Sequence, residues 1–334
     1  MFFKGDRKSI ELMVNAFDFF TKASGLMMNR SKSNFYCNGL AEHLIKGIED
    51  ETGMHRGTVP FKYLGINVSP KRLSVLDCTC LVDKVVDRIR GMGARKLSYA
   101  GRVVLIRSVL STLHSYWARI FVIPKTVIKR IESMCKGFLW HGNEQNEGPA
   151  LVSWDSICQP IKQGGLGIRK LHEWNIAALG KYVWWIEQKA DHLWVKWVHA
   201  VDIKGKDWKD YEPTINSSWA WWKICQVRTV LRQVLYGRNG PGGSYSATQG
   251  YKFLVPEGEK VSWYPWIRTG WIIPRHRFLI WLVAQQRLLT QDRLQKMGIV
   301  QTNVCFLCGV EEESHEHLFF RCVYSERCWA LVAT

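Results

Sequence analysis

The sequence has few acidic residues and no long apolar run. Its 334 residues include 46 Lys and Arg but only 29 Asp and Glu, which leaves a net charge of +17. The longest aliphatic and aromatic run, Phe278–Ala284, is far shorter than the ~20 residues that a membrane span needs. We therefore expect no membrane partner, and the charge favours a polyanion, with nucleic acid preferred over an acidic lipid surface.

A secretory signal is also missing, because the N-terminus MFFKGDRKS is charged from its fourth residue. The ten cysteines mostly lie in apolar segments, as buried reduced thiols do. An apolar fraction of 47% excludes wholesale disorder. We expect an intracellular protein, nuclear or cytoplasmic, with reduced thiols.

Motifs that would carry catalysis are lacking as well. The sequence contains no G-x-S-x-G, no H-E-x-x-H and no phosphate-binding loop, and Gly164-Gly165 does not have the spacing of one. The acidic pair Glu49-Asp50 lies in a polar stretch, which favours a solvated surface over acid–base chemistry. The residues themselves therefore predict no enzyme.

Apolar periodicity predicts a predominantly α-helical α+β fold. Helices are expected over 7–23, 74–91, 97–121, from Pro124 to about 140 and through most of 170–235, with strands over 33–37 and 61–68. The 17 Trp predict cores with aromatic edges. The expected domains are 1–70 with the strands, 71–170 as a basic helical region, 171–235 as a Trp-rich connector, 236–244 as a linker, and 245–334 as a metal-binding domain.

Positive charge is concentrated between Arg88 and Lys136. This span holds eleven basic residues and one acid, Glu132, and so accounts for ten of the seventeen excess charges. A solvated helix face normally mixes both signs, so the near absence of acids favours contacts with a phosphate backbone. The candidate nucleic-acid contacts here are Arg95, Lys96, Arg102, Arg107, Arg119, Lys125, Lys129 and Arg130.

The strongest local motif is a set of possible metal ligands near the C-terminus. Cys305 and Cys308 form a C-x2-C pair, and His317 and Cys322 follow at ligand spacing. Such a set predicts a structural Zn²⁺ site, because four ligands leave no open position for catalysis. His315 is the rival ligand, and Cys328 is expected to be a spare buried thiol. The alternative is a cluster of reduced cysteines beside a surface histidine.

Several segments, in one order, resemble the reverse transcriptases of LINE-type non-LTR retrotransposons. They span nearly the whole chain. The matching residues are Ser24-Gly25-Leu26 with Asn29 and Ser31-Lys32-Ser33, Tyr63-Leu64-Gly65-Ile66, Leu97–Arg102, Leu105–Leu110, Gly164–Ile168, Ile273-Pro274, Trp281, Arg287-Leu288, Asp292-Arg293-Leu294 and the Cys305/Cys308/His317/Cys322 set. The resemblance implies the end of a palm, a thumb, a connector and a reverse-transcriptase zinc-binding domain.

The resemblance also implies what this sequence does not contain. The family's Ala-Asp-Asp loop, which holds the two catalytic metal ions, would precede Met1, so catalytic Mg²⁺ is not expected in this chain. Lys32 matches a lysine that assists the departing pyrophosphate. Tyr63, Leu64 and Gly65 match the hairpin that grips the primer end, and Lys62 beside them is a further candidate nucleic-acid contact.

The expected function is therefore that of a reverse-transcriptase fragment. It lacks the catalytic loop but keeps a thumb that binds RNA, DNA or an RNA–DNA duplex through the backbone, and it is not catalytic alone. One alternative is a piece of an active RNA-directed DNA polymerase whose upstream part is absent from the gene model. The other is a zinc-dependent module that binds protein. Which protein partners it would have is not predicted.

Overall fold

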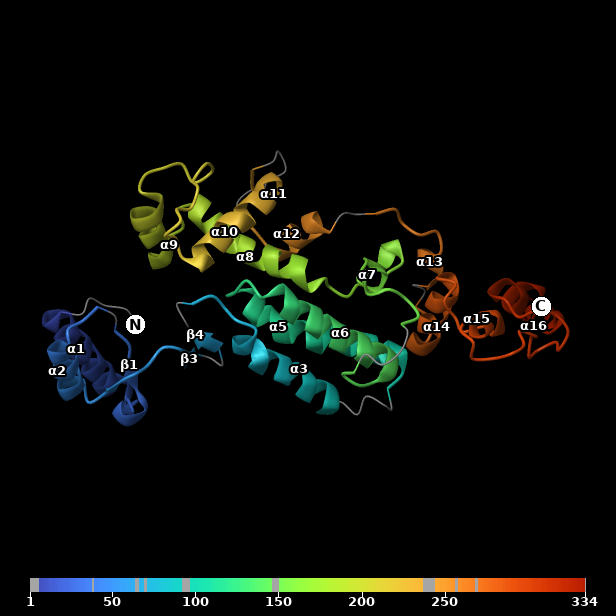
Figure 1. The fold of residues 1–334 in the computed structure, drawn as a ribbon, viewed down its shortest axis with the longest axis horizontal. Coiled ribbons are helices and arrows are strands. Elements are labelled where there is room, and N and C mark those ends of the chain that lie inside the picture. The colour runs from blue at the N-terminus through green and yellow to red at the C-terminus, as the bar shows by residue number, and fades with distance from the viewer. Residues whose placement is uncertain are drawn as a thin grey trace. The chain divides into compact units, whose positions relative to one another are not determined.

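The computed structural model describes residues 6–37, 39–63, 66–68, 71–91, 97–145, 150–236, 244–255, 258–267 and 270–333. The chain divides into two compact units, Met1–Arg72 and Leu73–Thr334. Its elements are mostly helices with a few short strands, which confirms the predicted predominantly helical α+β class (Figure 1). Among the described residues, no helix has both the length and the apolarity to cross a membrane.

Among its described residues, the first unit contains two α-helices and four very short strands. Its elements are α1 (Arg7–Ser24), η1 (Arg30–Lys32), β1 (Asn34–Phe35), α2 (Glu42–Thr52), β2 (His55–Arg56), β3 (Phe61–Tyr63) and β4 (Ile66–Val68). Strand β1 pairs with β2 in parallel, and β3 pairs with β4 as an antiparallel hairpin. Helix α1 begins where the Asp6 carboxylate accepts from the Ser9 N–H, 2.9 Å away, and it ends at Gly25.

The single strand predicted from the residue pattern over 61–68 is wrong, whereas the hairpin that the resemblance implies at this place is present as β3 and β4. The chain reverses between Tyr63 and Ile66, which face each other across the hairpin. Two three-residue strands pair their own backbone groups in this way, whereas one straight strand would need a partner from elsewhere. The strand predicted over 33–37 is present as β1, and the helix predicted over 7–23 is present as α1.

The second unit begins with a layer of helices that contains many of the basic residues of the 88–136 span. They are η2 (Leu76–Cys78), α3 (Thr79–Gly91), α4 (Tyr99–Leu105), the π-helical turn η4 (Ile106–Leu110), α5 (Ser111–Ala118) and α6 (Lys125–His141). Helices α3, α5 and α6 lie side by side (Figure 1). The continuous helix predicted over 97–121 is interrupted by η4, which separates α4 from α5.

A Trp-rich bundle follows. It contains α7 (Trp154–Ile157), η5 (Ile161–Gln163), α8 (Leu171–Glu187), α9 (Leu193–Val198), η6 (His199–Ile203), α10 (Trp219–Val230) and α11 (Arg232–Tyr236). Helix α8 packs against α10 and also against α5 of the basic layer. Buried aliphatic side chains and the rings of Trp208, Tyr211 and Trp221 fill the core of the bundle. Two of these three rings are tryptophans, in line with the aromatic contribution to the cores that was predicted from the 17 Trp.

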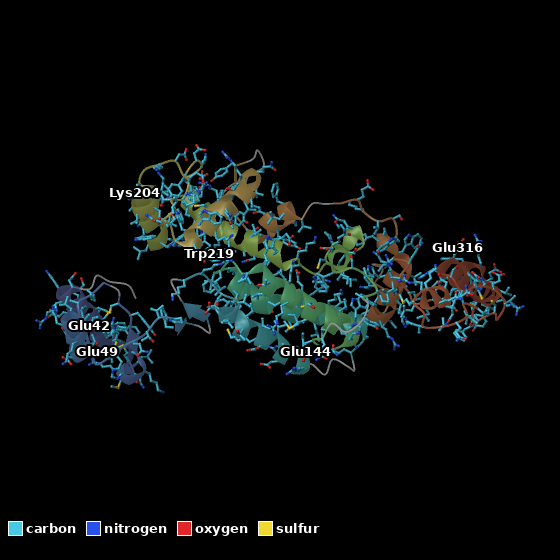
Figure 2. All side chains as sticks on the ribbon, in the orientation of Figure 1. Glu42, Glu49, Glu144, Lys204, Trp219 and Glu316 are labelled. Carbon is cyan, nitrogen blue, oxygen red and sulfur yellow. The ribbon has the colours of Figure 1, made fainter. Side chains whose placement is uncertain are left out.

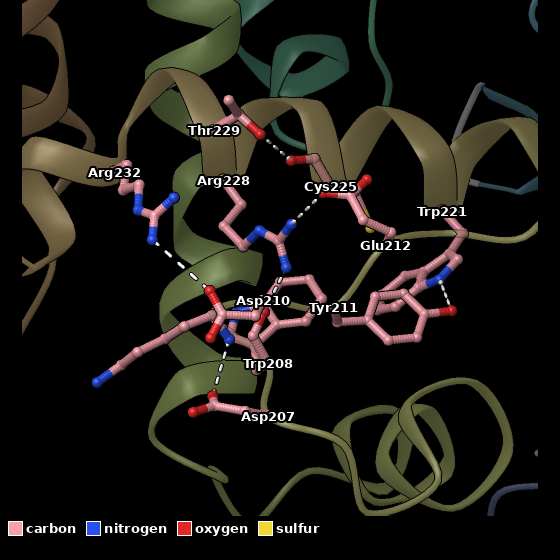
Figure 3. Close-up of polar contacts among 11 residues, drawn as sticks. Asp207, Trp208, Asp210, Tyr211, Glu212, Trp221, Cys225, Arg228, Thr229 and Arg232 are labelled. Carbon is pink, nitrogen blue, oxygen red and sulfur yellow. Dashed lines mark hydrogen bonds and ion pairs between the residues drawn. The ribbon is translucent and has the colours of Figure 1, made fainter.

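An arginine is buried inside this aromatic core. Arg228, on α10, is only 4% exposed, and its guanidinium carbon lies 4.8 Å from the centre of the Trp208 ring. One guanidinium nitrogen donates to the carbonyl oxygen of Trp208, and the other lies 3.8 Å from Glu212 (Figure 3). The arginine therefore anchors the loop before α10 to the helix.

We expect Arg228→Ala to lower the free energy of unfolding by about 2–4 kcal/mol. The variant removes the stacking on Trp208 and leaves a buried carbonyl without its donor. Arg232→Ala is a matched control on the next helix, because that exposed side chain lies 3.7 Å from Asp210, and we expect a change within about 0.5 kcal/mol (Figure 3). Urea unfolding of both variants measures the difference, and equal effects would contradict the anchoring role.

The C-terminal part contains α12 (Ala247–Leu254), α13 (Tyr264–Ile267), α14 (Pro274–Ala284), α15 (Gln291–Lys296), η7 (His317–Arg321) and α16 (Val323–Ala333). Helix α12 packs on α8, and α14 packs on α4. The first helices after the predicted linker therefore belong to the same packed body as the basic layer. The domain boundaries proposed within 71–334 stay predictions.

Candidate metal centre and basic surface

The C-x2-C pair lies in a tight turn built by local backbone hydrogen bonds. The N–H of Cys305 donates to the carbonyl of Glu311 at 2.8 Å, and the N–H of Gly309 donates back to the carbonyl of Cys305 at 2.8 Å. Gly309 has φ +69°, a left-handed conformation that glycine adopts without the Cβ clash of other residues. A short antiparallel bridge between Val304 and Glu312 closes the turn.

The structure brings the four predicted ligands together. One ligand atom each from Cys305, Cys308, His317 and Cys322 lies within 4.8 Å of the others. Three of these residues are buried, and Cys308 is half-buried. In tetrahedral zinc sites, zinc–sulfur bonds of ~2.3 Å and zinc–nitrogen bonds of ~2.0 Å keep the ligand atoms about 3.5–3.8 Å apart. The donor set and its spacing therefore fit Zn²⁺.

The orientation of His317 selects the nitrogen that faces the sulfurs. Its Nε2 lies 3.3 Å from Sγ of Cys308, while its Nδ1 lies 3.0 Å from a carboxylate oxygen of Glu311. A carboxylate near the far nitrogen is common at zinc-binding histidines; here Nδ1 is buried and makes no hydrogen bond to Glu311. His315, the rival predicted from sequence, is not in the four-atom cluster, and burial lowers its pKa.

The Cys308 thiol already favours the charged form that binds metal. The backbone N–H groups of Glu311 and Val310 point at its sulfur and lower its pKa to about 6. A thiolate is the metal-binding species, so these amides support metal binding near neutral pH. The turn therefore favours the thiolate at Cys308, whereas burial raises the pKa of Cys305.

Sequence reasoning did not find Glu313, which joins the metal centre to the helix before it. Its side chain is buried, with one oxygen accepting from the N–H of Gln291 at 3.0 Å and the other from the N–H of Phe306 at 3.3 Å. One carboxylate therefore caps the start of α15 and supports the cysteine turn. Glu311, Glu312 and Glu313 look alike in sequence, so no local signal singles it out.

The expectation for Cys328 is wrong. The sequence analysis placed it as a buried thiol, but it is exposed on α16. The helix turns it away from the metal cluster, and its neighbours Trp329, Leu331 and Val332 are also exposed. The apolar sequence around Cys328 suggested a buried segment, but α16 exposes these side chains.

Helix α6 presents a basic exposed face. Lys125, Lys129 and Arg130 are exposed, and helical spacing places them on the side opposite the buried residues Ile131 and Phe138. Within the described part of the chain, no carboxylate forms an ion pair with any of these three cations. The positive charge of this face is therefore available to an external anion.

Glu132, the one acid of the basic span, does not offset this face. It is half-buried between helices, with a carboxylate oxygen 3.5 Å from the backbone nitrogen of Leu171 at the start of α8. Burial raises the pKa of Glu132. The acid therefore faces the α8 junction and leaves the exposed side of α6 uniformly basic.

The candidate basic residues between the start of α4 and the end of α5 occupy different settings: Arg102 lies in α4, Arg107 in η4, and Arg119 directly after α5. Arg102 is half-buried, donates to the carbonyl of Leu139 at 3.0 Å and lies over the Tyr99 ring, and burial lowers its pKa. The hydrogen bond to Leu139 connects α4 to the end of α6, so the Arg102 guanidinium stabilises the packing of these two helices. Arg107 and Arg119 are exposed.

The other predicted site residues lie in the first unit or outside the described residues. Lys32 is exposed at the end of η1, where the side chain of Asn29 accepts from its backbone N–H. Lys62 and Tyr63 lie in strand β3. Leu64, Gly65, Arg95 and Lys96 lie outside the described residues.

Two comparisons with known proteins bear on this geometry. Residues 245–329 match a family described as zinc-binding in reverse transcriptase. The C-terminal region is thus similar to a reverse-transcriptase zinc-binding region. All four clustered ligands lie inside the matched range. So do α12 and α14, which pack on α8 and α4.

A curated relative extends the similarity. A protein of Arabidopsis thaliana named as a ribonuclease H protein is 29% identical over 143 residues. The match covers 42% of this chain and 23% of that protein. Together the two matches support a relationship to retroelement proteins, and the first supports zinc binding at the Cys305 cluster.

Proposed function

We propose that this chain is a LINE-type, reverse-transcriptase-related protein that binds nucleic acid and does not itself supply the catalytic carboxylates. The observation that carries the proposal is the exposed face of α6, where Lys125, Lys129 and Arg130 stand without ion-pair partners among the described residues. The match of 245–329 to the reverse-transcriptase zinc-binding family supports the retroelement origin.

The ligand of this face is a phosphate backbone, in RNA, DNA or an RNA–DNA duplex. Lysine and arginine displace condensed counterions from phosphates, which favours binding without reading the base sequence. Lys125 and Lys129 are one helical turn apart and Arg130 is adjacent, so the helix presents a row of cations rather than a single charge.

The zinc has a structural role in this proposal. Four protein ligands complete a tetrahedral shell, so the ion has no open position for a substrate or water. The residues around it are acidic, because 301–334 contain two arginines against five glutamates. Such a region attracts phosphate poorly, which favours a scaffold over a nucleic-acid clamp. The zinc would hold the cysteine turn against η7 and α16.

The test is the salt dependence of duplex binding by the full chain. We expect its affinity for a short RNA–DNA duplex to fall steeply between about 50 and 200 mM salt, with little dependence on base sequence. Fluorescence anisotropy of a labelled duplex measures the slope. Affinity that stays flat across this range would overturn the proposal, because counterion release would then make no contribution.

A further inference from the structure

A deep apolar cavity lies beside the basic layer and is not part of the surface proposed above. Its volume is about 570 Å³, within the range of small-ligand sites. Helix α4 contributes Val103 and Val104, the loop 160–167 forms the floor, and α14 contributes the rings of Phe278 and Trp281. Trp263 completes the aromatic wall.

Hydrogen bonds from α14 fix the loop wall of this cavity. The carbonyl oxygen of Gly164 accepts from Nε1 of Trp281 at 2.7 Å and from Nε2 of Gln285 at 2.8 Å. A Cβ at Gly165 would lie 2.0 Å from the carbonyl oxygen of Gln159, so only glycine fits there. The cavity is therefore preorganised by a loop that tolerates no side chain at this position.

A second, basic cavity adjoins the apolar one. Its volume is about 360 Å³, and it is lined by Val104, Arg107, Ser108, Gly167 and Arg169. Val104, Arg107 and Gly167 line both cavities, so the two share a wall. The Arg169 guanidinium carbon lies 4.2 Å from the centre of the Trp174 ring, which positions its charge.

The charged residues that line the two cavities are all basic. Lys162 and Arg277 join Arg107 around the apolar cavity, and none of the described residues that line either cavity is acidic. An apolar aromatic chamber beside two arginines matches a ligand with a flat apolar part attached to an anion.

Two exposed tryptophans lie close in sequence to residues that line the apolar cavity. Trp271 is 95% exposed and Trp266 is 76% exposed, although large apolar side chains are normally covered. Both lie within three residues of a lining residue, since Ile267 and Pro274 line the apolar cavity. Exposed indole rings next to a basic groove are typical of surfaces on which successive bases stack.

We propose that the two cavities together form a site for single-stranded nucleic acid. One base occupies the apolar cavity against Phe278 and Trp263, and its phosphate contacts Arg107 and Arg169. A neighbouring base stacks on Trp271, which is exposed. An acidic peptide would satisfy the arginines but offers no flat group to the aromatic chamber.

This site rests on the proposed nucleic-acid function but uses different residues from the α6 face. Duplex bases are stacked and paired inside the helix, so they cannot enter the cavity, whereas the α6 face contacts only phosphates. Single-strand binding and duplex binding are therefore separable by variant. If the chain binds duplex but not single strands, this inference fails and the proposed function stands. If it binds single strands but not duplex, the proposed function of the α6 face fails.

The experiment measures binding of a labelled single-stranded oligonucleotide to the full zinc-loaded chain by anisotropy. Val104→Trp places a larger side chain at the wall that the two cavities share and does not change the charge. We expect the affinity for the single strand to fall by about tenfold or more, which is the effect of one lost stacking contact. The same strand with abasic sites should bind the parent chain and Val104→Trp equally weakly. Duplex affinity should be unchanged by this variant.

Charge reversal tests the phosphate contact separately. Arg107→Glu/Arg169→Glu should weaken single-strand binding by about tenfold or more, whereas Lys204→Glu/Lys206→Glu makes the same charge change at exposed positions elsewhere and should have a much smaller effect. Circular dichroism verifies that each variant is folded. Equal affinity for normal and abasic strands, or displacement of the strand by an acidic peptide from the cavity, would overturn the inference.

Discussion

Cys305→Ser is expected to abolish zinc binding and to unfold the C-terminal knuckle, here defined as residues 301–329. Structural zinc supplies about 10–16 kcal/mol of apparent binding free energy in small zinc domains, and that binding is folding free energy. Phe306, Val310 and Phe320 of the knuckle are exposed, so little apolar burial remains to replace it. Metal analysis should give one zinc per parent chain and none for the variant.

Hydrogen exchange measures which part of the chain unfolds when the zinc is lost. We expect protection to vanish in 301–329 and to persist in the α8–α10 bundle, because that core has its own buried cluster. Unfolding of the whole second unit would contradict the local role of the metal.

The chain offers matched controls for the ligand assignment. Cys328→Ser removes an exposed thiol and should leave one zinc bound. His317→Ala should lose the zinc, while His315→Ala should retain it, because only His317 faces the cysteine sulfurs. Retention of zinc by His317→Ala together with its loss by His315→Ala would reverse the assignment.

The triple variant Lys125→Glu/Lys129→Glu/Arg130→Glu is expected to make the salt dependence of duplex binding much shallower. Each phosphate contact contributes about 0.9 to the slope of log affinity against log salt, so three lost contacts reduce it by nearly three. At ~0.1 M salt this corresponds to a loss of about two orders of magnitude or more in affinity. The three side chains are exposed, so the fold should be retained.

A second triple variant separates position from net charge. Lys189→Glu/Lys204→Glu/Lys206→Glu reverses three exposed charges on the loops after α8 and η6; Lys204 is labelled in Figure 2. We expect it to change the duplex slope by less than one. Equal losses in both triples would mean that only the total charge matters. Unchanged binding in the α6 triple would favour the alternative of a protein-binding module.

Local patterns predicted the elements that depend on local chemistry. Pro124 precedes α6 and Gly142 ends it, because proline lacks the N–H that a helix start leaves unpaired and glycine adopts the left-handed conformation that ends the helix. The apolar period of the N-terminal segment and its terminal Gly25 likewise predicted α1. Boundaries that rest on such caps agreed within a residue or two.

Local irregularities and long-range contacts were not predictable from apolar periodicity. The β3–β4 hairpin, which only the resemblance implied, and the π-helical turn within the 97–121 segment carry no distinct period. Arg102 resembled the other basic residues, yet its partner is the carbonyl of Leu139, 37 residues away. Glu313 resembled its glutamate neighbours, and its partner Gln291 lies 22 residues earlier.

The sequence by itself predicted the four candidate metal ligands that the fold brings together, because a C-x2-C turn with His317 and Cys322 downstream places its donors within one short segment. It also determined that the 88–136 span is basic. Only the tertiary structure decided which cations face outward and what the Gly164-Gly165 loop does. That loop is held by Trp281, 117 residues away, so its cavity exists only once α14 packs on α4.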